Sequence, residues 1–231
     1  MKWLAWISLV SVGCFASPIS IELPNQNKTI TYQQPVRLSQ ILNDAYQQLD
    51  YWPYELNSKL VETQANDEII TLRDDILSEL DLLQTNSAKA LIEQLSQFEY
   101  RKVVPIQLGF NHIRVYDRDN PLISNNHSLE LTKRSNLFGL VGLVPKPIFI
   151  PLRSGANLSD YLETIEHFES ADLAKPFIIQ PDGHITQAHI GHWQNKLFYP
   201  ASNAIVFIGI EGEDELNLKI ANLLRYAVVK Q

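Results

Sequence analysis

The same order of predicted elements, two strands followed by a helix and then further strands, occurs twice along the chain. This repeat constrains the fold more than any single motif does. The first occurrence opens with alternating apolar residues at 19–23 and 28–32, separated by the turn-forming residues 24–27. This alternation predicts a β-hairpin. Apolar residues then recur at helical spacing between Leu38 and Leu49, which predicts a short amphipathic helix. A hairpin followed by a helix is the opening of a β-grasp unit.

The second occurrence lies in the C-terminal half. Its expected hairpin pairs residues 137–144 with 148–152, and its expected helix covers 158–168. Another hairpin is expected at 177–186, around the turn Pro181-Asp182-Gly183. The apolar run at 204–210 is typical of a buried central strand.

A region in which apolar residues recur at helical spacing separates the two occurrences. Apolar spacing predicts one helix between Ile69 and Leu83 and another between Ala90 and Phe98, with a break at Asn86-Ser87. Because the break is short, the two helices should lie antiparallel as a hairpin. Residues 110–116 are then expected to form a strand that returns to the first unit.

The predicted fold class is therefore α+β, with two tandem β-grasp domains and a C-terminal amphipathic helix. The first domain covers residues 17–132 and contains the helical hairpin as an insertion at about 66–100. The second domain covers residues 133–212, and residues 213–231 form the C-terminal helix.

The C-terminal helix has an apolar stripe that includes Leu216, Ile220, Leu223 and Leu224. Two roles are open for this stripe: packing on its own domain, or binding a partner. The polar face lacks the Lys/Arg richness of helices that lie on membranes, so a protein partner is favoured over lipid.

Residues 1–16 have the layout of a cleavable secretory signal. Met1-Lys2 supplies a positive start, residues 3–12 are apolar, and small residues precede Ser17-Pro18. We expect cleavage after Ala16. An alternative is acylation at Cys14, because Val12-Gly13-Cys14 resembles the end of a lipoprotein box, although Ser11 stands where such boxes usually carry Leu.

The expected export of the chain and its net charge limit the classes of molecule that it could bind. Cys14 is the only cysteine, so the mature chain is held by its core rather than by disulfides. The net charge of −7 argues against nucleic acid or an anionic membrane surface as a partner. No later apolar run is long enough to cross a bilayer, so no transmembrane segment is expected after signal removal.

The chain carries no recognised catalytic motif. It has no G-x-S-x-G elbow, no phosphate-binding loop and no H-E-x-x-H pair. His184, His189 and His192 lie close in sequence, but the first two should point to opposite faces of a strand. We therefore predict no catalytic residues, no metal site and no cofactor.

Two arginines and two aromatic residues are the candidates for ligand binding. Arg114 falls inside the predicted strand 110–116, and Arg134 precedes the first strand of the second domain. Either guanidinium suits the carboxylate of an acidic sugar, with solvent exposure or a structural ion pair as the alternative. Tyr51 and Trp52 offer rings on which sugars stack, unless they close the first core instead.

Several segments, in their order along the chain, resemble the GfcC-like capsule and exopolysaccharide biosynthesis proteins of Gram-negative envelopes, which include the YjbG-like proteins. These segments are Val36-Arg37-Leu38-Ser39-Gln40-Ile41-Leu42, Tyr51-Trp52-Pro53, Ile113-Arg114, Asn120-Pro121-Leu122, Phe138-Gly139-Leu140-Val141, Ile179-Gln180-Pro181-Asp182-Gly183, Gly191-His192-Trp193 and Ala204-Ile205-Val206-Phe207-Ile208-Gly209. The resemblance covers essentially the whole mature chain.

The resemblance implies tandem domains like the soluble ligand-binding β-grasp (SLBB) modules of outer-membrane polysaccharide export channels. It also implies an arginine associated with a cleft, which Arg114 or Arg134 would supply. Lys133-Arg134-Ser135 stands where the family pattern has an Arg-Pro pair, so Arg134 departs from that pattern.

By this resemblance we expect a periplasmic, non-catalytic component of capsule or exopolysaccharide assembly. Its partners would be polysaccharide or the polysaccharide-export machinery. The alternatives are a periplasmic enzyme that modifies glycan, and a scaffold that contacts only proteins.

Overall fold

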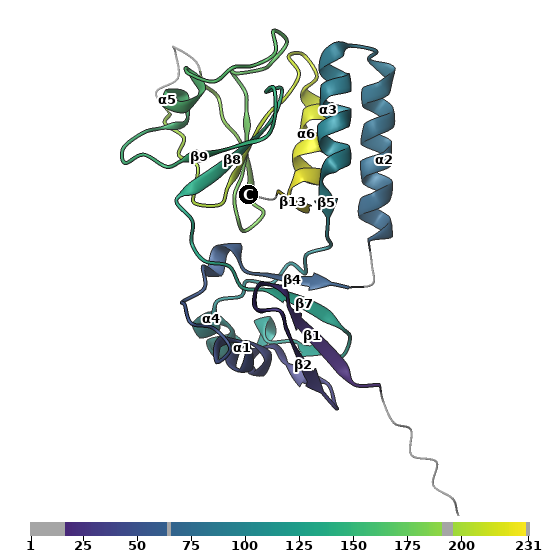
Figure 1. The fold of residues 1–231 in the computed structure, drawn as a ribbon, viewed down its shortest axis with the longest axis vertical. Coiled ribbons are helices and arrows are strands. Elements are labelled where there is room, and N and C mark those ends of the chain that lie inside the picture. The colour runs from purple at the N-terminus through teal and green to yellow at the C-terminus, as the bar shows by residue number, and fades with distance from the viewer. Residues whose placement is uncertain (1–16, 64–65, 191–195, 230–231) are drawn as a thin grey trace, which may run out of the picture.

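The computed structural model describes residues 17–63, 66–190 and 196–229, and over this range it is a mixed α+β protein (Figure 1). The predicted signal segment 1–16 and the segment Gly191-His192-Trp193 lie outside the described residues. None of the described helices combines the length and apolarity needed to span a bilayer.

The first sheet has four strands in the order β2-β1-β7-β4. Its members are β1 (Ile19–Leu23), β2 (Lys28–Tyr32), β4 (Lys59–Glu62) and β7 (His127–Glu130). The predicted first hairpin is confirmed, because β1 and β2 pair antiparallel with Ile21 opposite Ile30. β1 also pairs in parallel with β7, and β4 pairs antiparallel with β7.

Helix α1 (Leu38–Tyr46) forms where the apolar spacing predicted it and packs its buried residues into the first core. Its N-terminus is capped from a distant loop: Ser39 N donates to Asn120 Oδ1 at 2.9 Å. This bond satisfies a backbone donor that the helix itself leaves free. The short sheet of β3 (Val36–Arg37) and β6 (Leu122–Ile123) holds the two segments together.

The second sheet has five strands in the order β11-β10-β12-β8-β9. They are β8 (Leu137–Gly142), β9 (Ile148–Pro151), β10 (Phe177–Ile179), β11 (Ile185–Gln187) and β12 (Ile205–Ile208). The central position predicted for the apolar run at 204–210 is confirmed by β12, which pairs with both β10 and β8.

The two sheets repeat one connection pattern. In each sheet the first strand pairs antiparallel with the second and in parallel with the last. A helix follows the hairpin in both: α1 in the first unit and α5 (Leu158–Leu162) in the second. The repeat of patterns along the sequence therefore corresponds to a repeat of strand order.

The predicted helical hairpin consists of α2 (Asp67–Leu82) and α3 (Asn86–Gln97). It interrupts the first unit in sequence, but its buried residues belong to the same core as the second sheet. Helix α6 (Asp214–Leu224) shares this core and contacts α2. Figure 1 shows the hairpin beside the upper unit, away from β1, β2 and β7.

A two-stranded sheet of β5 (Glu99–Tyr100) and β13 (Ala227–Val228) lies at the base of the hairpin, between the two units (Figure 1). It corrects our expectation that the C-terminal helix continues to the end of the chain. The helix ends at Leu224, because the following residues bond to the free edge that β5 presents.

Two further expectations are wrong. Residues 110–116 contain helix α4 (Phe110–Val115) rather than a strand. The alternation at 112–116 favours a strand locally, but the packing of the buried Ile113 against α1 favours the helix. The helix predicted at 158–168 ends at Leu162; farther on, Phe168 N donates to Leu143 O at 3.0 Å, outside any helix.

Short 3-10 helices complete the described elements. They are η1 (Pro24–Gln26), η2 (Glu55–Asn57) and η3 (Asp117–Asp119). The first of them forms the turn between β1 and β2, where Asn27 adopts a left-handed conformation with φ of 54°. Asn tolerates that conformation better than most residues do.

Candidate functional site

A cavity of about 870 Å³ opens between the two sheets, and we call it the inter-unit cleft. Residues of the first unit, such as Tyr51 and Thr132, line one side, and Gly139 and Phe149 of the second sheet line the other. This volume lies within the range of pockets that bind small ligands.

The inter-unit cleft is cationic although the chain as a whole is anionic, with a net charge of −7. Its ionisable lining residues other than tyrosine are the cations Lys59, Arg101, Lys133 and Arg134 and the carboxylates Asp50 and Glu130. A cleft lined with an excess of one charge concentrates ligands of the opposite charge. The arrangement therefore favours an anionic ligand.

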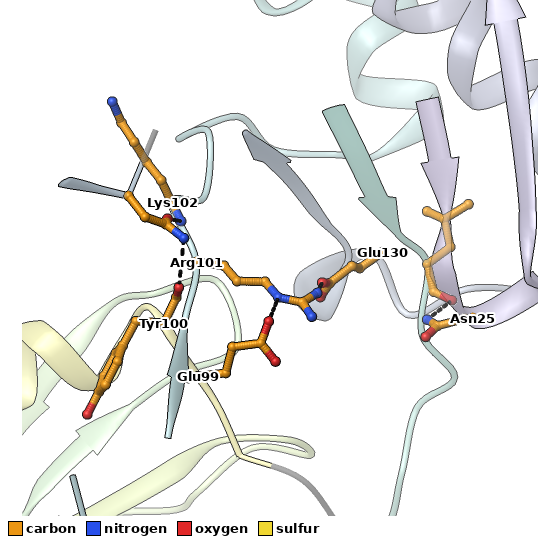
Figure 2. Close-up of polar contacts among 8 residues, drawn as sticks. Asn25, Glu99, Tyr100, Arg101, Lys102 and Glu130 are labelled. Atoms are coloured by element: carbon orange, nitrogen blue, oxygen red, sulfur yellow. Dashed lines mark hydrogen bonds and ion pairs between the residues drawn. The ribbon is translucent and has the colours of Figure 1, made fainter. Parts of the chain in front are cut away.

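Arg101 lies between two carboxylates, as Figure 2 shows. Its Nε donates to Glu99 Oε1 at 2.8 Å, and its Nη1 donates to Glu130 Oε1 at 2.5 Å. The hydrogen bond to Glu99 is the main reason that the pKa of Arg101 is raised. Because Glu130 belongs to β7 and Glu99 to β5, Arg101 links the first sheet to the small sheet beside the second unit.

Tyr51 and Lys133 form a fixed pair in the inter-unit cleft. The Tyr51 hydroxyl donates to Leu131 O at 2.5 Å and accepts from Gln26 Nε2 at 2.8 Å. Burial raises the pKa of this hydroxyl. Lys133 Nζ lies 4.5 Å from the centroid of the Tyr51 ring, a cation–π geometry.

Arg134 lies at the exposed rim of the same cleft. Its Cζ lies 5.5 Å from the centroid of the Tyr54 ring, and its Nε donates to Ser202 Oγ at 3.4 Å. Arg134 forms no ion pair with the described residues, so its guanidinium is free to bind a carboxylate of a ligand. The structure thus brings two of the predicted candidates, Tyr51 and Arg134, to one cleft.

The other two candidates, Trp52 and Arg114, lie outside the inter-unit cleft. Trp52 is 75% exposed and packs edge-on against Tyr46 at 5.8 Å. Arg114 is exposed on α4, with its Cζ 5.6 Å from the Phe110 ring. Since Phe110 also contacts Tyr46, these residues share an outer face of the first unit.

The apolar stripe of α6 is used inside the chain. Leu216, Ile220, Leu223 and Leu224 are all buried in the core that α6 shares with the second sheet. We therefore replace a partner-binding role for these four residues with core packing.

Four charged residues of the inter-unit cleft are not indicated by any pattern in the sequence. They are Lys59, Arg101, Lys133 and Glu130. Lys133 was next to a candidate, and the pair Leu60-Val61 after Lys59 is a weak strand signal. No pattern in the sequence indicates that residues 59, 101 and 133 meet, because their proximity depends on how the two units pack.

Within the described part of the chain, no cluster of three or more His, Cys, Asp or Glu side chains could hold a metal ion. His184 and His189 belong to that part, and His192 lies outside it. The cleft residues described above can form hydrogen bonds, ion pairs and ring-stacking contacts with a ligand.

Comparison with known proteins gives matches over most of the chain. Residues 16–134 match the family model "Capsule biosynthesis GfcC, N-terminal", and residues 146–228 match "Capsule biosynthesis GfcC C-terminal". The chain is also 26% identical over 141 residues to the Escherichia coli (strain K12) protein described as "Uncharacterized protein YjbG". That match spans 58% of this chain and 58% of the relative.

Proposed function

The chain belongs to the GfcC capsule biosynthesis family, and from this premise we propose that it binds an acidic glycan in the inter-unit cleft. In this proposal it is a periplasmic, non-catalytic component of capsule or exopolysaccharide assembly or export. It acts by holding a segment of polysaccharide, or by presenting that segment to the export machinery.

The observation that carries the proposal is the cationic lining of the inter-unit cleft. Arg134 has no carboxylate partner among the described residues, and Lys133 is held over the Tyr51 ring. Guanidinium and ammonium groups bind carboxylates, and an aromatic ring beside them suits the face of a sugar.

We further propose that both units are β-grasp domains of the SLBB-like kind. The support is the repeated strand order, in which the first strand lies between its hairpin partner and the last strand. The helix that follows each hairpin completes the pattern. A cleft between two such domains would use residues from both to hold one ligand.

The periplasmic location in this proposal depends on the secretory layout of residues 1–16. Fractionation of cells that produce the tagged full-length chain tests it, together with mass spectrometry of the mature N-terminus. A mature chain that begins at Ser17 supports cleavage after Ala16. An acylated Cys14 would place the protein on a lipid anchor instead.

The binding experiment uses the mature chain and the purified acidic polysaccharide of the organism that encodes it. We expect the double variant Lys133→Ala, Arg134→Ala to bind at least about tenfold more weakly in calorimetry, because two ion pairs are lost. The control double variant Lys89→Ala, Lys146→Ala removes the same number of charges from exposed positions outside the cleft. Equal affinities of the two double variants would contradict binding in the cleft.

The same incubation distinguishes the alternatives. Size-exclusion chromatography of the polysaccharide should give one unchanged profile before and after, whereas shortened chains would overturn the non-catalytic role. Deletion of the gene should lower surface polysaccharide, and the cleft double variant should fail to restore it. Full restoration by that variant, without measurable glycan binding, would favour the scaffold.

A further inference from the structure

Lys59 lies where two cavities of the structure meet. It lies in β4 and lines both the inter-unit cleft and a second cavity of about 590 Å³. Val103 and Tyr226 are the other residues common to both cavities. The neighbours Leu60 and Val61 are buried in the strand, so the backbone of Lys59 is firmly held.

The ammonium group of Lys59 has no partner among the described residues, although carboxylates lie in both cavities. Glu130 is opposite Lys59 in the pairing of β4 with β7, but Arg101 Nη1 already binds it at 2.5 Å. Glu68, in the smaller cavity, pairs with Lys102 Nζ at 3.7 Å. These two carboxylates are therefore paired with other cations, and Lys59 forms no ion pair with the described residues.

A charged group that is half-buried without a partner is unfavourable in the free protein. Burial accordingly lowers the pKa of Lys59, and the charge of Glu130 offsets only part of the effect. A protein gains nothing in stability from such a lysine, whereas a ligand that supplies the missing anion gains a charge-assisted hydrogen bond.

We propose that Lys59 binds the carboxylate of an acidic sugar unit where the two cavities meet. This inference rests on the proposed function and adds the group that the site recognises. The ammonium group is a compact charge with three donors, so one carboxylate satisfies it without the planar geometry that an arginine requires. Neutral sugars do not supply the anion.

The inference has two consequences that a purely structural lysine would not show together. Lys59→Met removes the unpaired charge and keeps the aliphatic stem, so the free protein should unfold at a higher temperature than the wild type. The same variant should bind the acidic polysaccharide about 10- to 100-fold more weakly, because a hydrogen bond between charged groups is lost. Lys59→Gln, which is polar and uncharged, should weaken binding similarly.

The experiment measures thermal unfolding of the mature chain without ligand and calorimetric binding of two probes. One probe is the purified acidic polysaccharide, and the other is the same material after carbodiimide activation and borohydride reduction of its carboxylates. The wild type should lose affinity for the reduced material, and Lys59→Met should show a smaller difference between the two probes than the wild type, because Lys133 and Arg134 still pair with carboxylates. Lys102→Met is the stability control, because Lys102 pairs with Glu62 and Glu68 and its loss should not raise the unfolding temperature.

Two results would overturn the inference while leaving the proposed function intact. One is a difference in affinity between the two probes that is as large for Lys59→Met as for the wild type. The other is a lower unfolding temperature for both Lys59→Met and Lys59→Gln, since Lys59 would then stabilise the free protein. Absence of binding to either probe by the wild type would instead overturn the proposed function, and with it this inference.

Discussion

Tyr46 carries a buried hydroxyl that forms no hydrogen bond with the described residues. It is the last residue of α1, and its ring contacts both Trp52 and Phe110. Burial raises the pKa of this hydroxyl to about 12, and the charge of Glu55 adds to the effect. A buried polar group without a partner lowers stability by about 1–3 kcal/mol.

Tyr46→Phe should therefore stabilise the protein by about 1 kcal/mol at neutral pH. In the wild type, the unfolded state ionises Tyr46 near pH 10 while the folded state keeps the proton, so stability should fall as the pH rises from 10 toward 12. Tyr46→Phe should make that fall smaller. Urea titrations at pH 7, 10 and 11 measure both effects.

Part of the alkaline fall should persist in Tyr46→Phe, because burial also raises the pKa values of Tyr32 and Tyr100. The hydrogen bond that Tyr32 donates to Asp44 adds to its shift. Identical stability curves for the wild type and Tyr46→Phe between pH 10 and 12 would contradict the prediction.

Individual residues also show how much of the candidate site could be predicted from the sequence. Tyr51 and Arg134 were chosen for their chemistry, and both line the inter-unit cleft. Arg114 is favoured by the same chemistry but lies outside the cleft, because residues 110–115 form helix α4 rather than the expected strand. Lys59 resembles any other lysine in the sequence; its burial without an ion pair, a property of the folded chain, distinguishes it.

Gln94 determines how α3 docks on the second sheet. Its Oε1 accepts from Gly142 N at 2.7 Å, and its Nε2 donates to Gly142 O at 3.3 Å. Gly142 has a φ of +105°, and an added Cβ would lie 2.1 Å from Ile208 O. The strand end therefore requires glycine, and the buried amide of Gln94 takes up the polar groups exposed there.

Gln94→Ala should destabilise the protein by about 2 kcal/mol, because it leaves the buried Gly142 N–H without its acceptor. Gln97→Ala is the matched control, since Gln97 lies on the same helix and is exposed. Its free energy of unfolding in urea should stay within about 0.5 kcal/mol of the wild type. Similar losses for both variants would contradict a specific role of the bond to Gly142, because alanine has the higher helix propensity and the exposed Gln97 has no such bond to lose.

At the scale of elements, periodicity predicted most of the fold. The hairpin at 19–32, helix α1, the helices α2 and α3 and the central strand β12 all appear where apolar spacing indicated them. One error occurs where a distant strand edge competes with local preference. Ala227 and Val228 continue a helical pattern, yet they pair with β5, whose position no local signal in the C-terminal segment indicates.

In the whole molecule, elements that follow one another in the sequence do not always pack together in space. The α2–α3 hairpin is inserted after β4 of the first sheet, yet Ile76, Leu80 and Leu91 belong to the core of the second unit. Lys219 Nζ of α6 also bonds to Glu79 Oε2 of α2 at 2.7 Å. An insertion that covers the neighbouring unit joins the two sheets more tightly than a single linker would.

The location of this core leads to a prediction about which unit the hairpin stabilises. Leu80 is fully buried on α2, so Leu80→Ala should cost about 3 kcal/mol, whereas Leu82→Ala on the same helix should cost little because Leu82 is 82% exposed. Native-state hydrogen exchange should show faster exchange in β8 and β12 for Leu80→Ala, with β1 and β7 unchanged. Faster exchange confined to β1 and β7 would instead place the hairpin in the first unit, as its position in the sequence suggests.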